Sequence, residues 1–303
     1  MPAMILKPEG FVLAVDSPEI NQVHALQLHL LTEVDRICRK NNINYYLLFG
    51  SLLGAVRHGG FIPWDDDIDI GVKRPEFDQL LDLLGQELDP ERYFIQTAAN
   101  DAGVTIPFAK IRCQHTLFEE YNATKEAEYN QGVFLDIFPL DNVPDNDKAN
   151  RRMKFQFFYY HFALRRKVEN YKSNRWYINF LYALGAVHDI PTLLQKRHDV
   201  MVSCDDDTSR RLIAMPSARQ DYDDSYLLRE QMDPPIDLDF CGHKFMAPKD
   251  TQVQLEMLFG DYMELPPPES RLGHRLRRFE IDEYFWKDIL EQFLPQVGSS
   301  GKF

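Results

Sequence analysis

Residues 49–70 read FGSLLGAVRHGGFIPWDDDIDI, and the order of small, apolar and acidic residues in this stretch determines the predicted fold. The apolar and aromatic residues 45–49 that lead into it indicate a short buried strand. A Gly-Ser pair then predicts a turn, the apolar run over 52–56 the start of a helix, and the Gly-Gly pair at 59–60 its end. A second strand is expected over residues 67–72. The segment therefore predicts a strand–helix–strand unit.

The acidic residues that end this stretch are predicted to form a metal site. Side chains alternate across a strand, so Asp65, Asp67 and Asp69 share one face, while Ile68 and Ile70 point into the core. Carboxylates on one face repel one another unless water, a proton or a cation relieves the repulsion. Mg²⁺ prefers such oxygen ligands and commonly keeps phosphate oxygens beside them, with Mn²⁺ as the alternative ion. A solvated acidic turn is the other interpretation, and the alternation with isoleucine argues against it.

A lone carboxylate in a distant strand is predicted to complete this site. Asp136 lies within Val133–Phe138, which is otherwise wholly apolar, and burying it without a partner would be costly. If this strand lies beside the first one, Asp136 joins Asp67 and Asp69 around the metal. The Gly-Ser pair, between a strand and a helix, is then placed to present backbone N–H groups to a phosphate.

The rest of the pattern predicts an α/β or α+β fold with a mixed sheet flanked by helices. Further strands are expected over 93–97 and 108–112, a polar turn over 139–147, and a hairpin around residues 241–243. The predicted domains are a catalytic core over residues 1–150, a mainly helical subdomain over 151–235, and a C-terminal hairpin and helix over 236–303 that complete the active site.

The block at residues 49–70 resembles the LicD family of phosphotransferases, which belongs to the nucleotidyltransferase-fold superfamily. Further blocks match in the family's order, and these are FAKIR at 108–112, GVFLDIFPLD at 132–141, FGDYM at 259–263 and LPP at 265–267. Together they span most of the chain, although residues 151–235 carry little of the family signature. The resemblance implies a nucleotidyltransferase-like mixed-sheet core.

The resemblance also implies transfer of a phosphorylated alcohol from a CDP-alcohol, CDP-choline in the first place, to a sugar hydroxyl. Family members move phosphocholine onto a bacterial surface glycan such as lipopolysaccharide or teichoic acid, and fukutin-type relatives move ribitol phosphate. Carried over by motif, the catalytic metal ligands are Asp67, Asp69 and Asp136, with Asp65 as an accessory ligand. The implied reaction is an in-line attack with CMP leaving, aided by Mg²⁺. Asp69 and Asp136 are both candidate proton acceptors.

Cationic and aromatic residues near these motifs are the candidate substrate ligands. Lys110 and Arg112 share a strand face, and they clamp the diphosphate or form an exposed polar edge. Arg271 and His274 follow the proline stop, and they close over the phosphate or form a basic surface turn. The other candidates are Gly50 and Ser51 for phosphate, Arg57 and His58 beside the Gly-Gly loop, and Trp64 as an aromatic partner of choline.

The composition excludes several classes of protein. With 303 residues and an apolar fraction of 44%, the chain can build a real core, and a formal net charge of −13 argues against binding to nucleic acid. The four cysteines are scattered, and no apolar run reaches about 18 residues, so neither a disulfide scaffold nor a membrane-spanning helix is expected. A cytoplasmic location is therefore predicted.

Residues 151–175 depart from this acidic average. Glu169 is their only acidic residue among many Lys and Arg residues, and aromatic residues lie between the charges. A basic helix with aromatic residues can lie on the inner face of an anionic membrane or hold a lipid-linked glycan acceptor. Alternatively, it packs as an ordinary helix whose basic side faces the acidic remainder of the chain.

Two other functions stay open at this point. A nucleotidyltransferase would build an NDP-linked compound and release pyrophosphate. A non-catalytic glycan-binding scaffold would keep the fold without the chemistry, and the intact set of Asp67, Asp69 and Asp136 argues against it.

Overall fold

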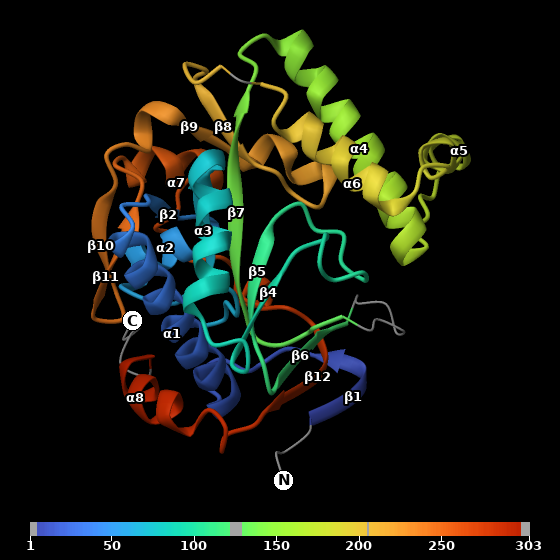
Figure 1. The fold of residues 1–303 in the computed structure, drawn as a ribbon. Coiled ribbons are helices and arrows are strands. Elements are labelled where there is room, and N and C mark those ends of the chain that lie inside the picture. Colours follow the sequence, from blue (N-terminus) through green and yellow to red (C-terminus); the bar gives the residue numbers. More distant parts are fainter. Residues whose placement is uncertain (1–4, 122–128, 205, 298–303) are drawn as a thin grey trace.

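The computed structural model describes residues 5–121, 129–204 and 206–297. Figure 1 shows a central sheet with helices around it. The helices are α1 (Pro18–Lys40), α2 (Phe49–His58), α3 (Arg74–Glu87), α4 (Asp147–Glu169), α5 (Trp176–Gly185), α6 (Ile190–Met201), α7 (Thr251–Phe259) and α8 (Lys287–Val297). The strands are β1 (Ile5–Phe11), β2 (Tyr45–Leu47), β3 (Asp69–Lys73), β4 (Tyr93–Gln96), β5 (Ala109–Cys113), β6 (Thr116–Glu120), β7 (Phe134–Val143), β8 (Arg211–Ala214), β9 (Tyr226–Leu228), β10 (Ile236–Phe240), β11 (His243–Ala247) and β12 (Leu276–Ile281).

The central sheet is built around the long strand β7. Its order is β2-β3-β7-β5-β4, with β8 added to β7 and β9 added to β8. Strands β3 and β7 run parallel, whereas the other pairs of this sheet are antiparallel, which confirms the predicted mixed sheet. Residues 134–137 of β7 pair with β5, and residues 140–143 pair with β8 on the same edge. One strand therefore joins the first half of the chain to residues 211–228.

The two faces of this sheet differ in polarity. Ile70 and Ile137 are buried in the main core together with Leu80 and Leu84 of α3, and α1 and α3 lie on that side (Figure 1). Because side chains alternate along a strand, the residues that precede these isoleucines point to the opposite face. Those residues are acidic, so the fold places carboxylates on the face that α1 and α3 leave uncovered.

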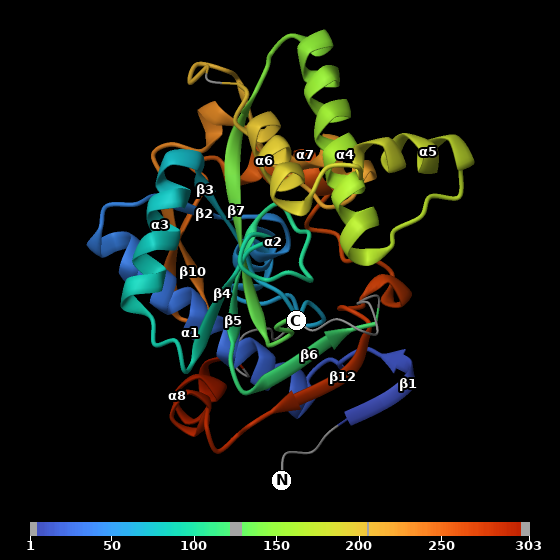
Figure 2. The same cartoon turned by 45° about the vertical axis from the view of Figure 1, so that its right-hand side comes forward.

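Two smaller sheets and a helical layer complete the fold. Strands β1, β12 and β6 form an antiparallel sheet, and β10 and β11 form the predicted hairpin, whose Cys241 N–H donates to the carbonyl of Gly59 at 2.7 Å. Helices α4, α5 and α6 gather at the end of the molecule away from α8 (Figure 2). Their core includes Phe158, Tyr182 and Tyr222.

Several local predictions are confirmed, and others are wrong. Helix α2 ends at His58 with Gly59 as its C-cap, as the Gly-Gly pair predicts, and α1 starts after Ser17, whose side chain accepts from the Ile20 N–H at 3.2 Å. The Gly-Ser pair at 50–51 lies in the first turn of α2 and does not form a separate turn. Strand β3 starts only at Asp69, so the earlier aspartates precede it. The expected polar turn over 139–147 is also wrong, because β7 continues to Val143.

The extension of β7 depends on a buried ion pair. Asp141 is buried, and Arg74, at the start of α3, donates Nε and Nη2 to its two carboxylate oxygens, each at 2.7 Å. This bidentate geometry satisfies a carboxylate that would otherwise be costly to bury. An aspartate that reads as a loop residue in the sequence is thereby held inside a strand.

We expect Arg74→Met to lower the free energy of unfolding by about 3–5 kcal/mol, because it leaves Asp141 charged and unpaired in the interior. The double variant Arg74→Met with Asp141→Leu should recover most of that loss, since no unpaired charge remains. Urea denaturation of the two variants and of wild type measures the difference. Equal destabilisation of the single and the double variant would show that the ion pair is not the source of the effect.

Candidate active site

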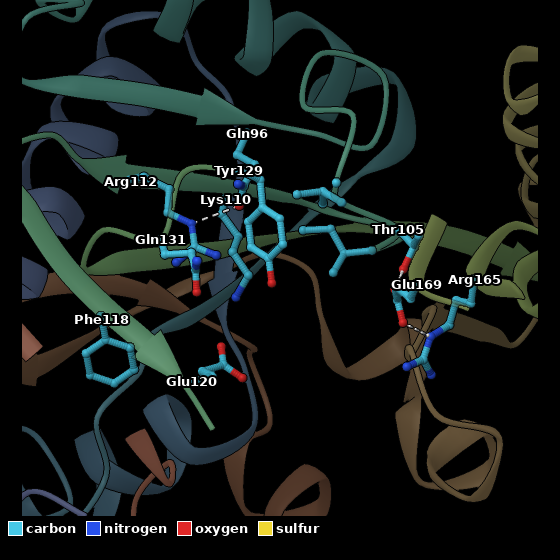
Figure 3. Close-up of a pocket in the computed structure, with 13 residues that line it drawn as sticks. Gln96, Thr105, Lys110, Arg112, Phe118, Glu120, Tyr129, Gln131, Arg165 and Glu169 are labelled. Atoms are coloured by element: carbon cyan, nitrogen blue, oxygen red, sulfur yellow. Dashed lines mark hydrogen bonds and ion pairs between the residues drawn. The ribbon is translucent and has the colours of Figure 1, made fainter. Parts of the chain in front are cut away.

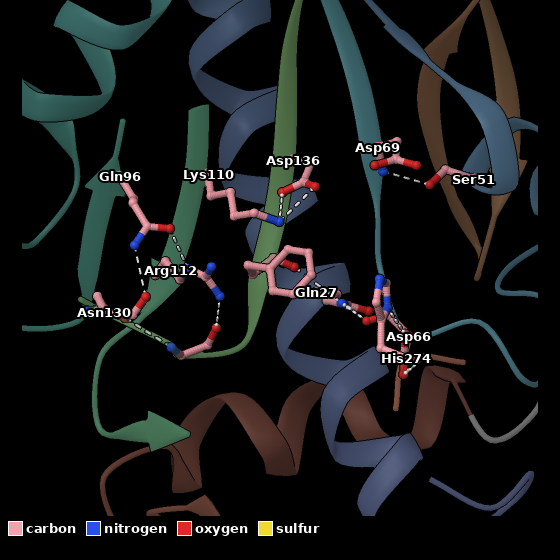
Figure 4. A network of polar contacts seen from close by, with 12 residues as sticks. Gln27, Ser51, Asp66, Asp69, Gln96, Lys110, Arg112, Asn130, Asp136 and His274 are labelled. Atoms are coloured by element: carbon pink, nitrogen blue, oxygen red, sulfur yellow. Dashed lines mark hydrogen bonds and ion pairs between the residues drawn. The ribbon is translucent and has the colours of Figure 1, made fainter. Parts of the chain in front are cut away.

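Four carboxylates meet where β3 begins. Asp69 and Asp136 are direct register partners on the parallel strands β3 and β7, which confirms that the two acidic strands are neighbours (Figure 4). Asp65 and Asp67 lie in the segment that leads into β3. Together with Asp69 they line a cavity of about 1020 Å³. The predicted metal ligands are thus brought to one place.

The electrostatics of these residues show an uncompensated excess of negative charge. Burial raises the pKa of Asp65 well above its usual value, and the charges of Asp67 and Asp66 raise it further. Burial likewise raises the pKa of Asp69, with added repulsion from Asp67 and Asp136. The pKa of Asp136 rises to about 6, mainly through burial and against the attraction of Lys110. Such mutual repulsion is what a bound cation would relieve.

Lys110 is the one predicted cation that reaches the carboxylates. From β5 its Nζ lies 2.7 Å from Asp136 Oδ1 and donates to Oδ2 at 2.9 Å, and it sits 3.5 Å from the centroid of the Phe134 ring. The Oδ1 contact is an ion pair without hydrogen-bond geometry, so this buried oxygen accepts no hydrogen bond among the described residues. Asp136 therefore keeps one oxygen available for another ligand.

The start of α2 borders the same cavity. Phe49 and Gly50 line it, and among the described residues no side chain caps this helix. A Cβ on Gly50 would lie 2.5 Å from Asp65 Oδ2, so only glycine lets that carboxylate approach the helix start. The hydroxyl of Ser51 accepts from the backbone N–H of Asp69 at 2.8 Å and thereby ties α2 to β3. The first turn thus presents backbone N–H groups toward the acidic site, as a phosphate-binding helix start does.

A second layer of contacts fixes the acidic segment, and sequence reasoning missed most of it. Asp66 is buried and accepts from the backbone N–H of His274 at 2.9 Å and from its Nδ1 at 2.6 Å. Burial opposes the charged imidazolium, but the Asp66 hydrogen bond and the charge of Asp67 outweigh it and raise the pKa of His274 to about 10. From α1, His24 Nε2 lies 2.6 Å from the carbonyl oxygen of Asp65, and Gln27 donates to that of Asp66 at 2.7 Å. His274 therefore holds the segment in place and does not line the cavity.

Other predicted substrate ligands are divided between two places. Arg57 and Trp64 line the large cavity, and Arg57 Nη1 donates to the carbonyl of Tyr262 at 2.8 Å. Arg271 lies over the Trp64 ring at 5.4 Å and donates to the carbonyl of Pro266. Burial and the charge of Arg57 lower the pKa of His58 to about 4, so this imidazole is neutral near neutral pH.

Arg112 faces a second, smaller cavity of about 240 Å³, which Lys110 also lines (Figure 3). The Arg112 guanidinium donates to Gln96 Oε1 and to the carbonyl of Gly132, each at 2.8 Å. Arg112 is buried, so the alternative of an exposed polar edge is wrong. A role of Arg112 in clamping the diphosphate stays a prediction. Lys110 lines this smaller cavity and pairs with Asp136, whereas Asp65, Asp67 and Asp69 line the larger one.

The carboxylate oxygens are suitable ligands for a divalent cation, although the side chains are not yet close enough together to coordinate one. Within residues 5–121, 129–204 and 206–297, no three His, Cys, Asp or Glu side chains are spaced to hold a metal ion as they stand. The fit rests instead on the crowding of carboxylates, on the raised pKa values of Asp65, Asp69 and Asp136, and on Asp136 Oδ1, which accepts no hydrogen bond among the described residues.

The fold and site define an α+β protein with a carboxylate cluster on the open face of a mixed sheet. Residues 42–182 match the family described as LicD/FKTN/FKRP, nucleotidyltransferase domain. This match agrees with the resemblance to the LicD family that the motifs indicated. It is 29% identical over 273 residues to the lipopolysaccharide cholinephosphotransferase LicD of Haemophilus influenzae, covering 84% of this chain and 95% of that protein. It is also 47% identical over 45 residues to the human ribitol 5-phosphate transferase FKRP, covering 15% of this chain and 9% of that protein.

The carboxylate cluster predicts opposite effects of two amide substitutions in metal-free buffer. Asp69→Asn should raise the unfolding temperature by a few degrees at pH 7 to 8, because ionised Asp69 is disfavoured in the folded state. Asp136→Asn should lower it, because it leaves the Lys110 ammonium buried without its partner. Thermal unfolding in the presence of a chelator measures both.

The pH dependence of the Asp69→Asn effect provides an internal check. Since the pKa of Asp69 is raised in the folded state, its carboxyl takes up a proton as the pH falls and the repulsion disappears. The advantage of Asp69→Asn should therefore shrink toward about pH 4. The control Asp261→Asn, at an exposed position on the same cavity, should change stability little. A destabilising Asp69→Asn at pH 8 would contradict the crowding argument.

Proposed function

We propose that this protein is a divalent-cation-dependent transferase of phospho-alcohol groups. It moves the group, phosphocholine in the first place, from a CDP-alcohol to a sugar hydroxyl of a bacterial surface glycan or its lipid-linked precursor and releases CMP. The observation that carries the proposal is the crowded set of Asp65, Asp67, Asp69 and Asp136 beside a cavity of about 1020 Å³. The similarity to a lipopolysaccharide cholinephosphotransferase and to a ribitol 5-phosphate transferase supports the reaction class.

Mg²⁺, or Mn²⁺ in its place, is proposed to be held by Asp67, Asp69 and Asp136, with Asp65 as an accessory ligand. When bound there, the ion would supply charge neutralisation and alignment for a diphosphate. The raised pKa values of Asp65, Asp69 and Asp136 support this assignment, because burial and mutual repulsion raise them despite the attraction of Lys110.

The protein's own groups are proposed to position the donor and to take up the proton. The uncapped first turn of α2 holds a phosphate through backbone N–H groups, and Arg57 borders the same cavity. The acceptor hydroxyl oxygen bonds to the phosphorus that carries the alcohol, the bond from phosphorus to the CMP oxygen breaks, and a carboxylate receives the hydroxyl proton. Asp69 and Asp136 are both candidates for that last role.

The wall of the cavity offers support for a quaternary ammonium group. Aromatic rings and acidic side chains both border it, and these are the features that bind choline. The rings are Phe49, Trp64, Phe108, Phe138, Phe259 and Tyr262, and the nearby acids are Asp221, Asp224, Asp261 and Glu264. Choline is therefore the first choice among alcohols, and ribitol, glycerol and ethanolamine are the alternatives to test.

A nucleotidyltransferase is the second candidate, because the family description contains that activity class. It would join a nucleoside triphosphate to a phosphorylated compound and release pyrophosphate, with the same carboxylates serving the metal. A non-catalytic scaffold is disfavoured by the same residues, since carboxylates crowded in this way destabilise a fold that does not use them.

Product analysis tests the proposal. With Mg²⁺, CDP-choline and a glycan acceptor, we expect release of CMP, and Asp67→Ala or Asp69→Ala should reduce turnover at least about a hundredfold. The control Asp239→Ala, on the exposed hairpin, should keep full activity. All variants are checked for folding by thermal unfolding. Pyrophosphate release from CTP without CMP release from any CDP-alcohol would favour the nucleotidyltransferase, and full activity of both cavity variants would refute the metal assignment.

A thermal-shift comparison identifies the alcohol. CDP-choline, CDP-ethanolamine, CDP-glycerol and CDP-ribitol are each added with Mg²⁺, and the true donor should raise the unfolding temperature most, on the order of 5 °C at a hundredfold excess over its Kd. The rise should disappear when a chelator removes the metal. A rise with CDP-ribitol or CDP-glycerol but not with CDP-choline would replace choline as the transferred alcohol.

A further inference from the structure

We infer that the outer face of α5 and the turn after it form a docking surface for an anionic lipid bilayer. Five apolar or aromatic residues are exposed within twelve positions, and Trp176, Phe180 and Val187 are exposed by 80%, 62% and 76%. Tyr177 and Leu184 are the other two. Residues 176, 180 and 184 are four apart and therefore lie on one side of the helix. Contiguous exposed apolar surface of this kind marks an interaction site.

The opposite side of α5 is already packed, so its exposed face is not a consequence of a loose helix. Tyr182 is buried in the cluster with Phe162 and Tyr222, and its ring lies 5.1 Å from that of Phe162. A Cβ on Gly185 would lie 2.7 Å from the Cβ of Ala163, so glycine permits the close approach of α5 to α4. Lys167 of α4 donates to the carbonyls of Ala186 and His188 at the end of α5. The helix is thus held with its second apolar side outward (Figure 2).

The charge around this face suits an anionic lipid surface. Residues 170–188 contain Lys172 and Arg175 and no aspartate or glutamate, in a chain of net charge −13. Both cations are exposed, at the start of α5. A short apolar helix face with flanking Lys and Arg, and with Trp and Tyr at its end, suits the boundary between headgroups and acyl chains.

The geometry indicates a helix that lies in the membrane surface and does not cross it. Ten residues of α5 extend about 15 Å, whereas the hydrocarbon core is about 30 Å thick. In the part of the chain that the structure describes, no helix has the length and apolarity to span a bilayer. The proposed contact centres on α5 and not on residues 151–175. Phe157, Phe158 and Phe162 of α4 are buried, and although Phe155 is 50% exposed, the larger group of exposed aromatic residues lies on α5.

This docking surface would bring the proposed enzyme to a membrane-bound acceptor. Only this role of the surface rests on the proposed function. Tyr182 of α5 packs in one cluster with Met215 and Tyr222, and neighbouring residues 214, 216–218 and 221 line the large cavity. A lipid-linked glycan would therefore reach the cavity from a membrane on which the helical layer rests. Binding to the bilayer itself needs no catalysis, so the two proposals fail separately.

Flotation with vesicles tests the surface. Wild type should float with vesicles of phosphatidylethanolamine and phosphatidylglycerol and much less with phosphatidylcholine alone. The double variant Trp176→Ser with Phe180→Ser should bind on the order of a hundredfold more weakly, because each buried aromatic side chain contributes about tenfold or more. Lys172→Ala with Arg175→Ala should lose about tenfold, on the anionic vesicles alone. The matched control Tyr284→Ser, at a 90% exposed position beside α8, should bind like wild type.

Two further measurements keep the outcome decisive. The inactive Asp67→Ala variant should float like wild type, which separates this inference from the proposed chemistry. Light scattering after gel filtration measures the mass of wild type and of the Trp176→Ser/Phe180→Ser variant. Wild type that does not float, a double variant that floats equally well, or a dimer that only the double variant loses would each overturn the bilayer assignment.

Discussion

The parallel pairing of β3 with β7 is the constraint on which the site depends. It sets Asp69 directly beside Asp136, and alternation along both strands turns the two carboxylates to the same face. The isoleucines that follow them are fixed in the core on the other side, so a slip by one residue would bury two charges under α1 and α3. The hydrophobic core therefore specifies the position of the acidic pair. Its electrostatic cost is offset on one side only, by Lys110.

The remaining contacts keep the carboxylates close despite their repulsion. Ser51 binds the backbone of Asp69, His274 binds the carboxylate of Asp66, and α1 binds two carbonyls of the same segment through His24 and Gln27. All these groups act on the backbone or on Asp66, and they leave the side chains of Asp65, Asp67 and Asp69 facing the cavity. Phe49 adds an unfavourable backbone conformation at the same place. Its φ of 45° is one that bulky residues disfavour, and it lies where α2 meets the cavity. The fold thus stores unfavourable interactions where binding of a ligand can relieve them.

Sequence reasoning recovered what depends on local pattern. The alternation of aspartate with isoleucine and the lone Asp136 in an apolar strand were sufficient to predict that the two strands are neighbours. It could not recover what depends on distant partners. Arg112 lies on the same predicted strand face as Lys110, so the sequence gives both side chains the same prediction. In the fold, however, Arg112 donates hydrogen bonds to Gln96 and Gly132 from other segments. Asp66 points away from the acidic face, and nothing in its neighbours reveals His274, more than two hundred residues later.

The sequence pattern did not predict strands β8, β9 and β12, and the physical reason is again that their partners are distant in the chain. Strand β12 carries Arg277 and Arg278 between apolar residues, and the two arginines are paired with Glu119 of β6, so the strand is stabilised by a partner that its own sequence does not contain. Strands β8 and β9 are short and gain their stability from the far half of β7. A strand whose hydrogen bonds and charges are satisfied elsewhere in the chain leaves only a weak local signal.

Negative and positive charges are concentrated in different parts of the molecule. The carboxylates around Asp69 concentrate negative charge at the cavity, while residues 170–188 carry only positive charge beside an exposed apolar face. An anionic surface therefore attracts one end of the protein and repels the acidic remainder, so that electrostatics alone orients the chain before any apolar contact forms. A net charge that reads as an acidic average over 303 residues is, in the folded protein, divided between a carboxylate-lined cavity and a basic segment with an exposed apolar face.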